Sequence, residues 1–175
     1  MAPLRAELEA FWATGPPLAL EIGFDHGITL LDNARCFPDW RWLGVELRRA
    51  RVEALRPLCP QNCLALRLDA RTLLSRAPPG RLHRVDILFP TPAVRGRHLL
   101  LTPALVDDLQ RALVPGGIVQ VRTDVPALAA LATELLGGWT EAPAPPSGAA
   151  LSRRERVSRR DGLPIWGVVR RTATT

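Results

Sequence analysis

The feature that most constrains the fold is the stretch Leu18 to Gly27, LALEIGFDHG, in which a short apolar run ends at two glycines. The run has the length of a buried strand, and glycine lets the backbone turn sharply and approach a ligand closely. Nineteen residues after Gly27, a second apolar run ends at Glu46. A strand, a glycine turn, a helix and a second strand ending in an acid are typical of the first half of a doubly wound, Rossmann-like α/β fold.

Apolar runs and segments of helical periodicity alternate along the chain, which predicts a mostly parallel sheet with helices on both faces. The predicted strands are Leu18 to Gly23, Arg41 to Glu46, Cys63 to Leu68, Arg84 to Phe89, Ile118 to Arg122 and Ile165 to Arg170. The predicted helices are Gly27 to Cys36, Arg49 to Leu58, Pro103 to Leu113 and Pro126 to Leu136. The proline-rich segment 142–148 should form an exposed, mobile loop, because proline lacks the donor that a ladder needs.

The length of 175 residues suits one hydrophobic core and not two, so we expect residues 1–175 to form a single domain. The longest apolar runs are far shorter than the roughly 20 residues that span a bilayer, and the N-terminus lacks the order of a signal peptide. These features predict a cytoplasmic protein without membrane contact. The cysteines lack the partners of a zinc site, so no metal is expected. The sequence leaves open whether the protein is a monomer or a homodimer.

Arginine is concentrated near the C-terminus. The chain contains no lysine, and residues 152–175 hold seven arginines against Glu155 and Asp161, so nearly all of the net charge of +6 lies there. Guanidinium groups can fork onto phosphate oxygens and release counterions from a nucleic acid. This basic C-terminal segment therefore favours contact with RNA, although a solvated surface rich in arginine has the same composition.

The charges around the glycine turn distinguish between two classes of cofactor. A dinucleotide would place its pyrophosphate against the first turn, where Glu21 and Asp25 would repel it. S-adenosylmethionine carries an ammonium and a sulfonium, which the same acids would attract. We therefore favour S-adenosylmethionine, with Glu46 at the ribose hydroxyls and Asp69 at the adenine edge. The predicted cofactor-binding residues are Glu21, Gly23, Gly27, Glu46 and Asp69.

The sequence also resembles the bacterial tRNA (guanine-N7)-methyltransferases. The matching stretches occur in family order from residue 18 onward: Leu20 to Phe24, Leu43 to Arg49, Leu68 to Ala70, Ile87 to Pro90 with Pro92, Arg97 with His98, Pro115 to Gly117, Thr123 with Asp124, and Ser152 to Trp166. The phenylalanine-proline loop is the most family-specific of them. The resemblance implies a Rossmann-like class I methyltransferase fold with a seven-stranded sheet, and methyl transfer from S-adenosylmethionine to guanine N7 in tRNA.

The resemblance also implies roles for individual residues. It places Glu21, Glu46 and Asp69 at the cofactor, and Thr91 and Arg95 in the catalytic loop. The residues that stand where the family contacts its guanosine are Arg95, Asp124, Ser152 and Glu155. For Asp124 a structural role is the alternative, because it could cap the helix predicted to begin near Pro126.

The chain departs from the family pattern at four positions. Asp25 replaces a glycine, Thr91 the loop aspartate, Ala93 a tryptophan and Leu163 a histidine. Guanine N7 carries a lone pair and no proton at neutral pH, so its attack on the methyl group requires alignment and no general base. We therefore expect methyl transfer in spite of Thr91. The alternative is a divergent paralogue that binds S-adenosylmethionine or RNA without this activity, or methylates another acceptor.

Overall fold

The computed structural model describes residues 2–13, 15–91 and 99–174. The strands are β1 (Leu18–Ile22), β2 (Arg41–Glu46), β3 (Cys63–Arg67), β4 (Leu82–Leu88), β5 (Leu113–Thr123), β6 (Thr140–Glu141) and β7 (Trp166–Arg171). The helices are α1 (Ala2–Trp12), α2 (Ile28–Cys36), α3 (Arg49–Leu55), the 3-10 helix η1 (Arg56–Leu58), α4 (Ala70–Ser75), α5 (Pro103–Ala112), α6 (Pro126–Leu135) and α7 (Arg153–Arg160). None of the helices in the described ranges is long and apolar enough to cross a bilayer.

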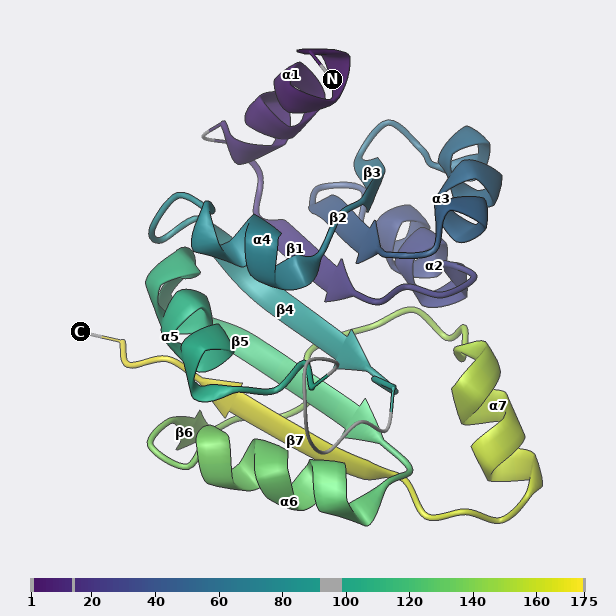
Figure 1. The fold of residues 1–175 in the computed structure, drawn as a ribbon, viewed down its shortest axis with the longest axis vertical. Coiled ribbons are helices and arrows are strands. Elements are labelled where there is room, and N and C mark those ends of the chain that lie inside the picture. The colour runs from purple at the N-terminus through teal and green to yellow at the C-terminus, as the bar shows by residue number, and fades with distance from the viewer. Residues whose placement is uncertain (1, 14, 92–98, 175) are drawn as a thin grey trace.

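The strands form one sheet in the order β3-β2-β1-β4-β5-β7-β6 (Figure 1). Neighbours among β1 to β5 pair in parallel, while β7 is antiparallel to both β5 and β6. This topology confirms the predicted mostly parallel, seven-stranded sheet. The order of winding reverses between β1 and β4, and ligands of open α/β sheets bind at the carboxyl ends of the strands beside such a switch point.

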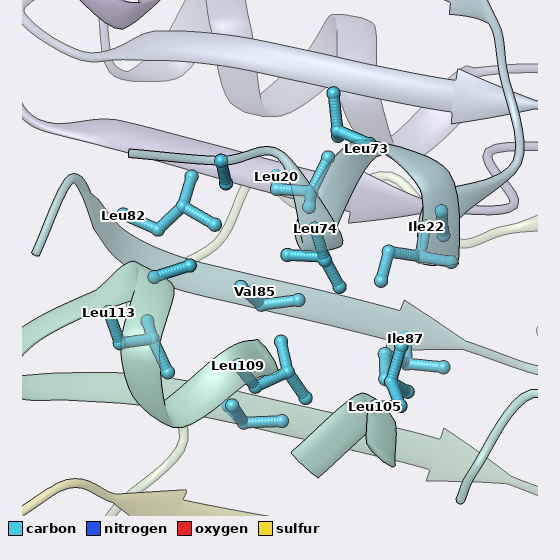
Figure 2. Packing of buried hydrophobic residues seen from close by; sticks show 14 of the residues in the cluster. Leu20, Ile22, Leu73, Leu74, Leu82, Val85, Ile87, Leu105, Leu109 and Leu113 are labelled. Atoms are coloured by element: carbon cyan, nitrogen blue, oxygen red, sulfur yellow. The ribbon is translucent and has the colours of Figure 1, made fainter. Parts of the chain in front are cut away.

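Hydrophobic side chains cover both faces of the sheet. On one face, leucines of α4 and α5 such as Leu74 and Leu109 cluster with Val85 of β4, as Figure 2 shows. On the other face, α2 and α3 pack over β1, β2 and β3 through a second cluster. Gly44 of β2 allows α2 to approach this face, because a Cβ there would lie 2.3 Å from Cδ2 of Leu30. The two layers hold the carboxyl ends of β1 to β5 in fixed positions.

Residues 142–151, here called the strap, connect β6 to α7. In Figure 1 this light-green segment passes behind the sheet and reaches α7 at the right. The segment is irregular and largely exposed, as expected, but it does not lie free of the fold: Arg84 of β4 and two residues of α2 bind it by hydrogen bonds. The sequence could not reveal these contacts, because the partners lie 62 to 118 residues away from the strap in the chain.

Several predicted elements have different bounds. The helix predicted from Arg49 to Leu58 becomes α3 followed by η1, because Pro57 lacks the N–H that would continue the α-helical bonding. Strand β5 begins at Leu113 rather than at Ile118, because Leu113 pairs with Leu82 before an irregularity in the ladder. The elements α1, α4, β6 and α7 were not predicted. Helix α7 has no apolar stripe, but its Ser152-Arg-Arg-Glu155 start has the spacing of a capping box.

Candidate active site at the carboxyl edge of the sheet

Gly23 and Gly27 form the turn between β1 and α2, and both have a left-handed backbone, with φ of +73° and +68°. A Cβ at Gly23 would meet no heavy atom of the described residues within 4 Å, so this glycine leaves the backbone open to a ligand. A Cβ at Gly27 would lie 2.3 Å from Cδ2 of Leu55, so the packing of α2 against α3 also requires glycine there. The two glycines of the turn therefore have different roles.

Asp25 lies in the same turn, where the family that the sequence resembles usually has glycine. Its backbone is also left-handed, with φ of +51°. Aspartate enters this region more readily than most residues, because its short polar side chain can bond locally. Asp25 thus keeps a backbone conformation that favours glycine. Its carboxylate forms ion pairs with Arg48 at 2.7 Å and Arg51 at 3.4 Å.

Glu46 ends β2 and is only 7% exposed. Its carboxylate accepts hydrogen bonds from the backbone N–H groups of Asp25 at 3.1 Å and Arg48 at 3.0 Å, and from Nε of Arg48 at 3.1 Å. Burial acts to raise the pKa of Glu46, but the bonds from Arg48 and Asp25 outweigh it and lower the pKa below its ordinary value. Glu46 is therefore an ionised acceptor beside the glycine turn.

Asp69 follows β3 and caps α4, where its Oδ1 accepts a hydrogen bond from the backbone N–H of Arg71 at 2.9 Å. The guanidinium of Arg71 lies 2.7 Å from Oδ2, and its hydrogen bonds lower the pKa of Asp69. Capping and ligand contact are compatible, because a carboxylate has about four acceptor positions. Asp69 and Glu46 thus share one arrangement, an acid at a strand end bound by an arginine two residues later.

Glu21 of β1 is 2% exposed and points to the same face as α2. Its Oε1 accepts a hydrogen bond of 2.6 Å from Oγ1 of Thr29, whereas Oε2 is buried without a hydrogen-bond partner among the described residues. Burial raises the pKa of Glu21 to about 8; the bond from Thr29 opposes this rise, and the neighbouring Asp86 of β4 adds to it. A buried acceptor that lacks a donor favours a cationic ligand.

Glu21, Glu46 and Asp69 fit S-adenosylmethionine. They come from, or directly follow, the adjacent parallel strands β1, β2 and β3, and the open backbone at Gly23 follows the end of β1. An ammonium would supply the donor that Oε2 of Glu21 lacks, and ribose hydroxyls can donate to carboxylates such as that of Glu46. The acids that would repel a pyrophosphate thus lie on neighbouring strands of one sheet, and their contact with the cofactor stays a prediction.

Asp124 follows β5 and connects it to α7. Its Oδ2 accepts hydrogen bonds from Oγ of Ser158 at 2.7 Å and from Nε of Arg154 at 2.6 Å. Burial opposes ionisation, but the bonds from Ser158 and Arg154 lower the pKa of Asp124. The alternative role as a helix cap is wrong, because α6 has Val125 as its N-cap without a side-chain bond.

Ser152 and Glu155 lie at the start of α7, which stands beside the carboxyl ends of β4 and β5 (Figure 1). Oγ of Ser152 accepts the bond from the backbone N–H of Glu155 at 3.1 Å. The Glu155 side chain is 3% exposed, and its Oε1 accepts bonds from Arg122 at 2.6 Å and from Arg159 at 2.8 Å. Two of the sequence-predicted acceptor residues, Asp124 and Glu155, therefore form ion pairs that join α7 to β5 and the residue after it, while Ser152 caps α7.

The loop after β4 carries the remaining predicted residues. Phe89 has a left-handed backbone with φ of +50°, which is unusual for an aromatic residue and is typical of functional sites. Its N–H donates to the carbonyl of Arg122 at 2.7 Å, so the loop starts from a fixed point beside β5. Thr91 is exposed at the sheet edge. Arg95, like Ala93 and His98, lies outside the described residues.

Sequence reasoning missed several residues that contact the site. Arg48 and Arg71 could have been suspected, because each follows a predicted cofactor acid by two positions. Thr29 is the second residue of α2, directly after the glycine turn, and its hydroxyl donates to Glu21. Arg122 and Ser158 gave no such signal, since each binds a residue 33 or 34 positions away.

The sequence of this chain is similar to a family of methyltransferases and to individual proteins of known name. A family described as "Putative methyltransferase" matches residues 16–141. The tRNA (guanine-N(7)-)-methyltransferase of Nostoc sp. is 31% identical over 190 residues, which cover 94% of this chain and 83% of that protein. The protein of the same name from Azorhizobium caulinodans is 38% identical over 118 residues, 62% of this chain. The chain spans 50% of the length of that relative.

Solved structures add evidence on the fold. The 16S rRNA methyltransferase KamB superimposes with a TM-score of 0.68 over 96% of this chain and 93% of that chain, at 17% sequence identity. At this identity the similarity concerns the arrangement of strands and helices. It agrees with the class I methyltransferase fold predicted from the sequence.

Proposed function

The chain belongs to the family of the tRNA (guanine-N7)-methyltransferases, and from this premise we propose that it transfers a methyl group from S-adenosylmethionine to guanine N7 in tRNA. The observation that carries the proposal is the buried Oε2 of Glu21 near the glycine turn, which lacks a partner within the described ranges, together with the acids Glu46 and Asp69 at the ends of the neighbouring strands. This cluster suits a cationic cofactor with a ribose. We further infer that the protein acts on tRNA in the cytoplasm.

On the cofactor side, Glu21 would bind the ammonium, Glu46 the ribose hydroxyls and Asp69 the adenine edge. Gly23 would let the backbone lie against the ligand, and Gly27 would keep the turn closed against Leu55. When bound, S-adenosylmethionine supplies a methyl group on a sulfonium, which makes that carbon electrophilic. The protein then has to hold the cofactor still and direct the guanine toward it.

On the acceptor side, guanine N7 has no proton to lose, so the residues align the base and need not act as a base themselves. Thr91 and Arg95 would contact the guanosine from the loop after β4. Asp124, Ser152 and Glu155 are engaged with α7 or β5, so we infer that they support the guanosine site by fixing α7 beside β5. Thr91 can offer guanine a neutral hydroxyl where the family usually has a carboxylate.

A methyl-transfer assay tests the proposal. Purified protein, radiolabelled S-adenosylmethionine and bulk tRNA that lacks 7-methylguanosine are incubated, and the RNA is digested for nucleoside analysis. We expect label in 7-methylguanosine, and loss of that label in Glu46→Ala. Label in a different nucleoside would contradict the N7 assignment.

A divergent paralogue is the second candidate function, and the replacement of the loop aspartate by Thr91 favours it. Such a protein would bind S-adenosylmethionine or tRNA yet form no 7-methylguanosine. Calorimetry with the cofactor and filter binding with tRNA, run beside the methyl-transfer assay, therefore separate the two candidates.

A further inference from the structure

A buried arginine of the sheet binds the strap by hydrogen bonds. Arg84 of β4 is 4% exposed, and its Nε donates to Asp86 at 2.8 Å. Its Nη2 donates to Oγ of Ser147 at 2.9 Å, and its Nη1 donates to the carbonyl of Pro146. The guanidinium also lies over the ring of Trp42, 5.3 Å from its centroid. Arg84 thus fixes the middle of the strap against the sheet.

Helix α2 holds the second half of the strap. Oδ1 of Asn33 accepts the bond from the backbone N–H of Gly148 at 2.8 Å, and Oδ2 of Asp32 accepts the bond from the N–H of Ala150 at 2.8 Å. A Cβ at Gly148 would lie 2.0 Å from Oδ2 of Asp32, so any larger residue at position 148 would displace either the Asp32 carboxylate or the strap from this arrangement. Two residues after Ala150, Ser152 caps α7.

Helix α2 therefore contacts both halves of the candidate site. Its Thr29 binds Glu21, and one turn later Asp32 and Asn33 bind the backbone that leads into α7. We propose that Asp32 and Asn33 are positioning residues that set the placement of α7, and with it of the acceptor guanosine, relative to the cofactor. This inference rests on the proposed function for its acceptor, but the placement of α7 can be measured without it.

The test compares four variants with the wild type. Asp32→Ala removes the acceptor for Ala150, and Gly148→Ala introduces a Cβ that clashes with the Asp32 carboxylate and so disturbs the same bond. Asp32→Asn keeps an accepting oxygen and removes the charge, so it separates the hydrogen bond from a change in attraction for RNA. Asp107 is an exposed aspartate on α5, and Asp107→Ala is the matched control for loss of one acid.

Hydrogen exchange of the α7 peptide measures its placement. We expect exchange to increase severalfold in Asp32→Ala and Gly148→Ala and to stay at the wild-type level in Asp32→Asn and Asp107→Ala. Affinity for S-adenosylmethionine, measured by calorimetry, should stay within about twofold in all four and shows that each is folded. Unchanged α7 exchange in both Asp32→Ala and Gly148→Ala would overturn the proposal.

Steady-state kinetics then tests the consequence for the acceptor. In Asp32→Ala and Gly148→Ala, kcat/KM for tRNA should fall about tenfold, whereas KM for S-adenosylmethionine changes little. Asp32→Asn should restore the tRNA parameters. Equal losses for both substrates would mean that the strap only stabilises the fold, and would overturn the positioning role. An inactive wild type would contradict the proposed function, while the exchange measurements would still decide how α7 is placed.

Discussion

The cofactor half and the acceptor half of the candidate site are built in different ways. On the cofactor side, Glu46 and Asp69 each bind an arginine two residues later, within one strand-to-helix connection. On the acceptor side, Asp124 binds Arg154 across 30 residues, and Glu155 binds Arg122 across 33. These two pairs are local, although Glu46 also accepts a bond from the N–H of Asp25, 21 residues earlier, so the cofactor half needs the pairing of β1 with β2 as well. The acceptor half exists only when β5, the strap and α7 have come together.

This difference explains where the chain departs from its family. Asp25, the one departure in the cofactor turn, adopts the left-handed backbone that favours glycine and therefore leaves the turn intact. Of the other departures, Thr91 follows β4 and Leu163 follows α7, whereas Ala93 lies outside the described residues. In the acceptor half, side chains from separate elements make the contacts. A substitution there alters those contacts and leaves the backbone at the strand ends in place. The comparison teaches that cofactor binding and acceptor choice can diverge separately.

Glu46→Ala gives the largest expected effect and tests whether the halves are separable. Loss of two charge-assisted bonds to the ribose should weaken S-adenosylmethionine binding at least tenfold, and about a hundredfold if both have ordinary strength. Binding of tRNA should not change. Calorimetry and filter binding measure the two affinities, with the exposed Glu53→Ala as control. An unchanged cofactor affinity would remove Glu46 from the cofactor site.

The pH dependence of S-adenosylmethionine binding tests the role of the buried Glu21 in the cofactor half. Burial raises the pKa of Glu21 from 4.5 to about 8, with Asp86 adding to the rise and Thr29 and Arg84 opposing it. The ammonium favours ionised Glu21, so binding should release a proton and affinity should rise between about pH 6 and 7.5, by up to about tenfold per unit. Calorimetry on the wild type and Glu21→Gln checks this. An equal slope in Glu21→Gln would assign the proton to another group.

The same pKa shift predicts a stability effect of definite sign. Without cofactor, folded Glu21 keeps its proton above the pH at which the unfolded chain loses it. The folded state therefore binds more protons between pH 4.5 and about 8, and the free energy of unfolding should fall as pH rises through this range. Denaturant unfolding of the wild type and Glu21→Gln, compared across these pH values, measures the contribution.

Thr91→Asp tests the acceptor half at the position where threonine replaces the loop aspartate of the family. A carboxylate at this exposed position would accept from the donor edge of guanine and should raise tRNA methylation by about tenfold, through a charge-assisted contact. Affinity for S-adenosylmethionine should hardly change. Single-turnover methylation with saturating cofactor is the measurement. If activity falls instead, another residue already contacts that edge and the new charge disturbs it.

Substitutions of the arginines of α7 give the smallest expected effect. They compare the arginines of the basic C-terminal segment that form ion pairs with those that form none among the described residues. Arg154, Arg159 and Arg160 form ion pairs with Asp124, Glu155 and Asp161, whereas Arg153 and Arg156 have no ion pair with any residue in the described ranges. Changing Arg153 and Arg156 to glutamine should reduce the slope of log affinity for tRNA against log salt by about 0.7 to 0.9 per lost phosphate contact. The same change at Arg159 and Arg160 is the control and should have less effect. Equal slopes in both would mean that the ion pairs leave these arginines free to bind RNA.

The sequence predicted the elements that have a strong local pattern. Strand β2 has the predicted bounds Arg41 to Glu46, because an apolar run ending in an acid is recognisable by itself. Helix α7 was missed, since RRERVSRR has no apolar periodicity and its side chains bond to Asp124 and Arg122, which lie about 30 residues earlier. The contacts of the strap were not predicted for a related reason: the proline content of a segment indicates that ladder hydrogen bonds are absent, but it gives no information about a distant buried partner such as Arg84.

By itself, the sequence determined the sheet class, the glycine turn and the acids at the cofactor end, because strand periodicity, turn residues and strand-end charges are properties of neighbouring residues. Only the tertiary structure decided that Asp25 adopts the backbone of a glycine, that α2 holds the strap and that Asp124 and Glu155 bind α7 to β5. These contacts join residues far apart in the chain. Their partners are selected by packing of the folded layers, which local sequence pattern does not encode.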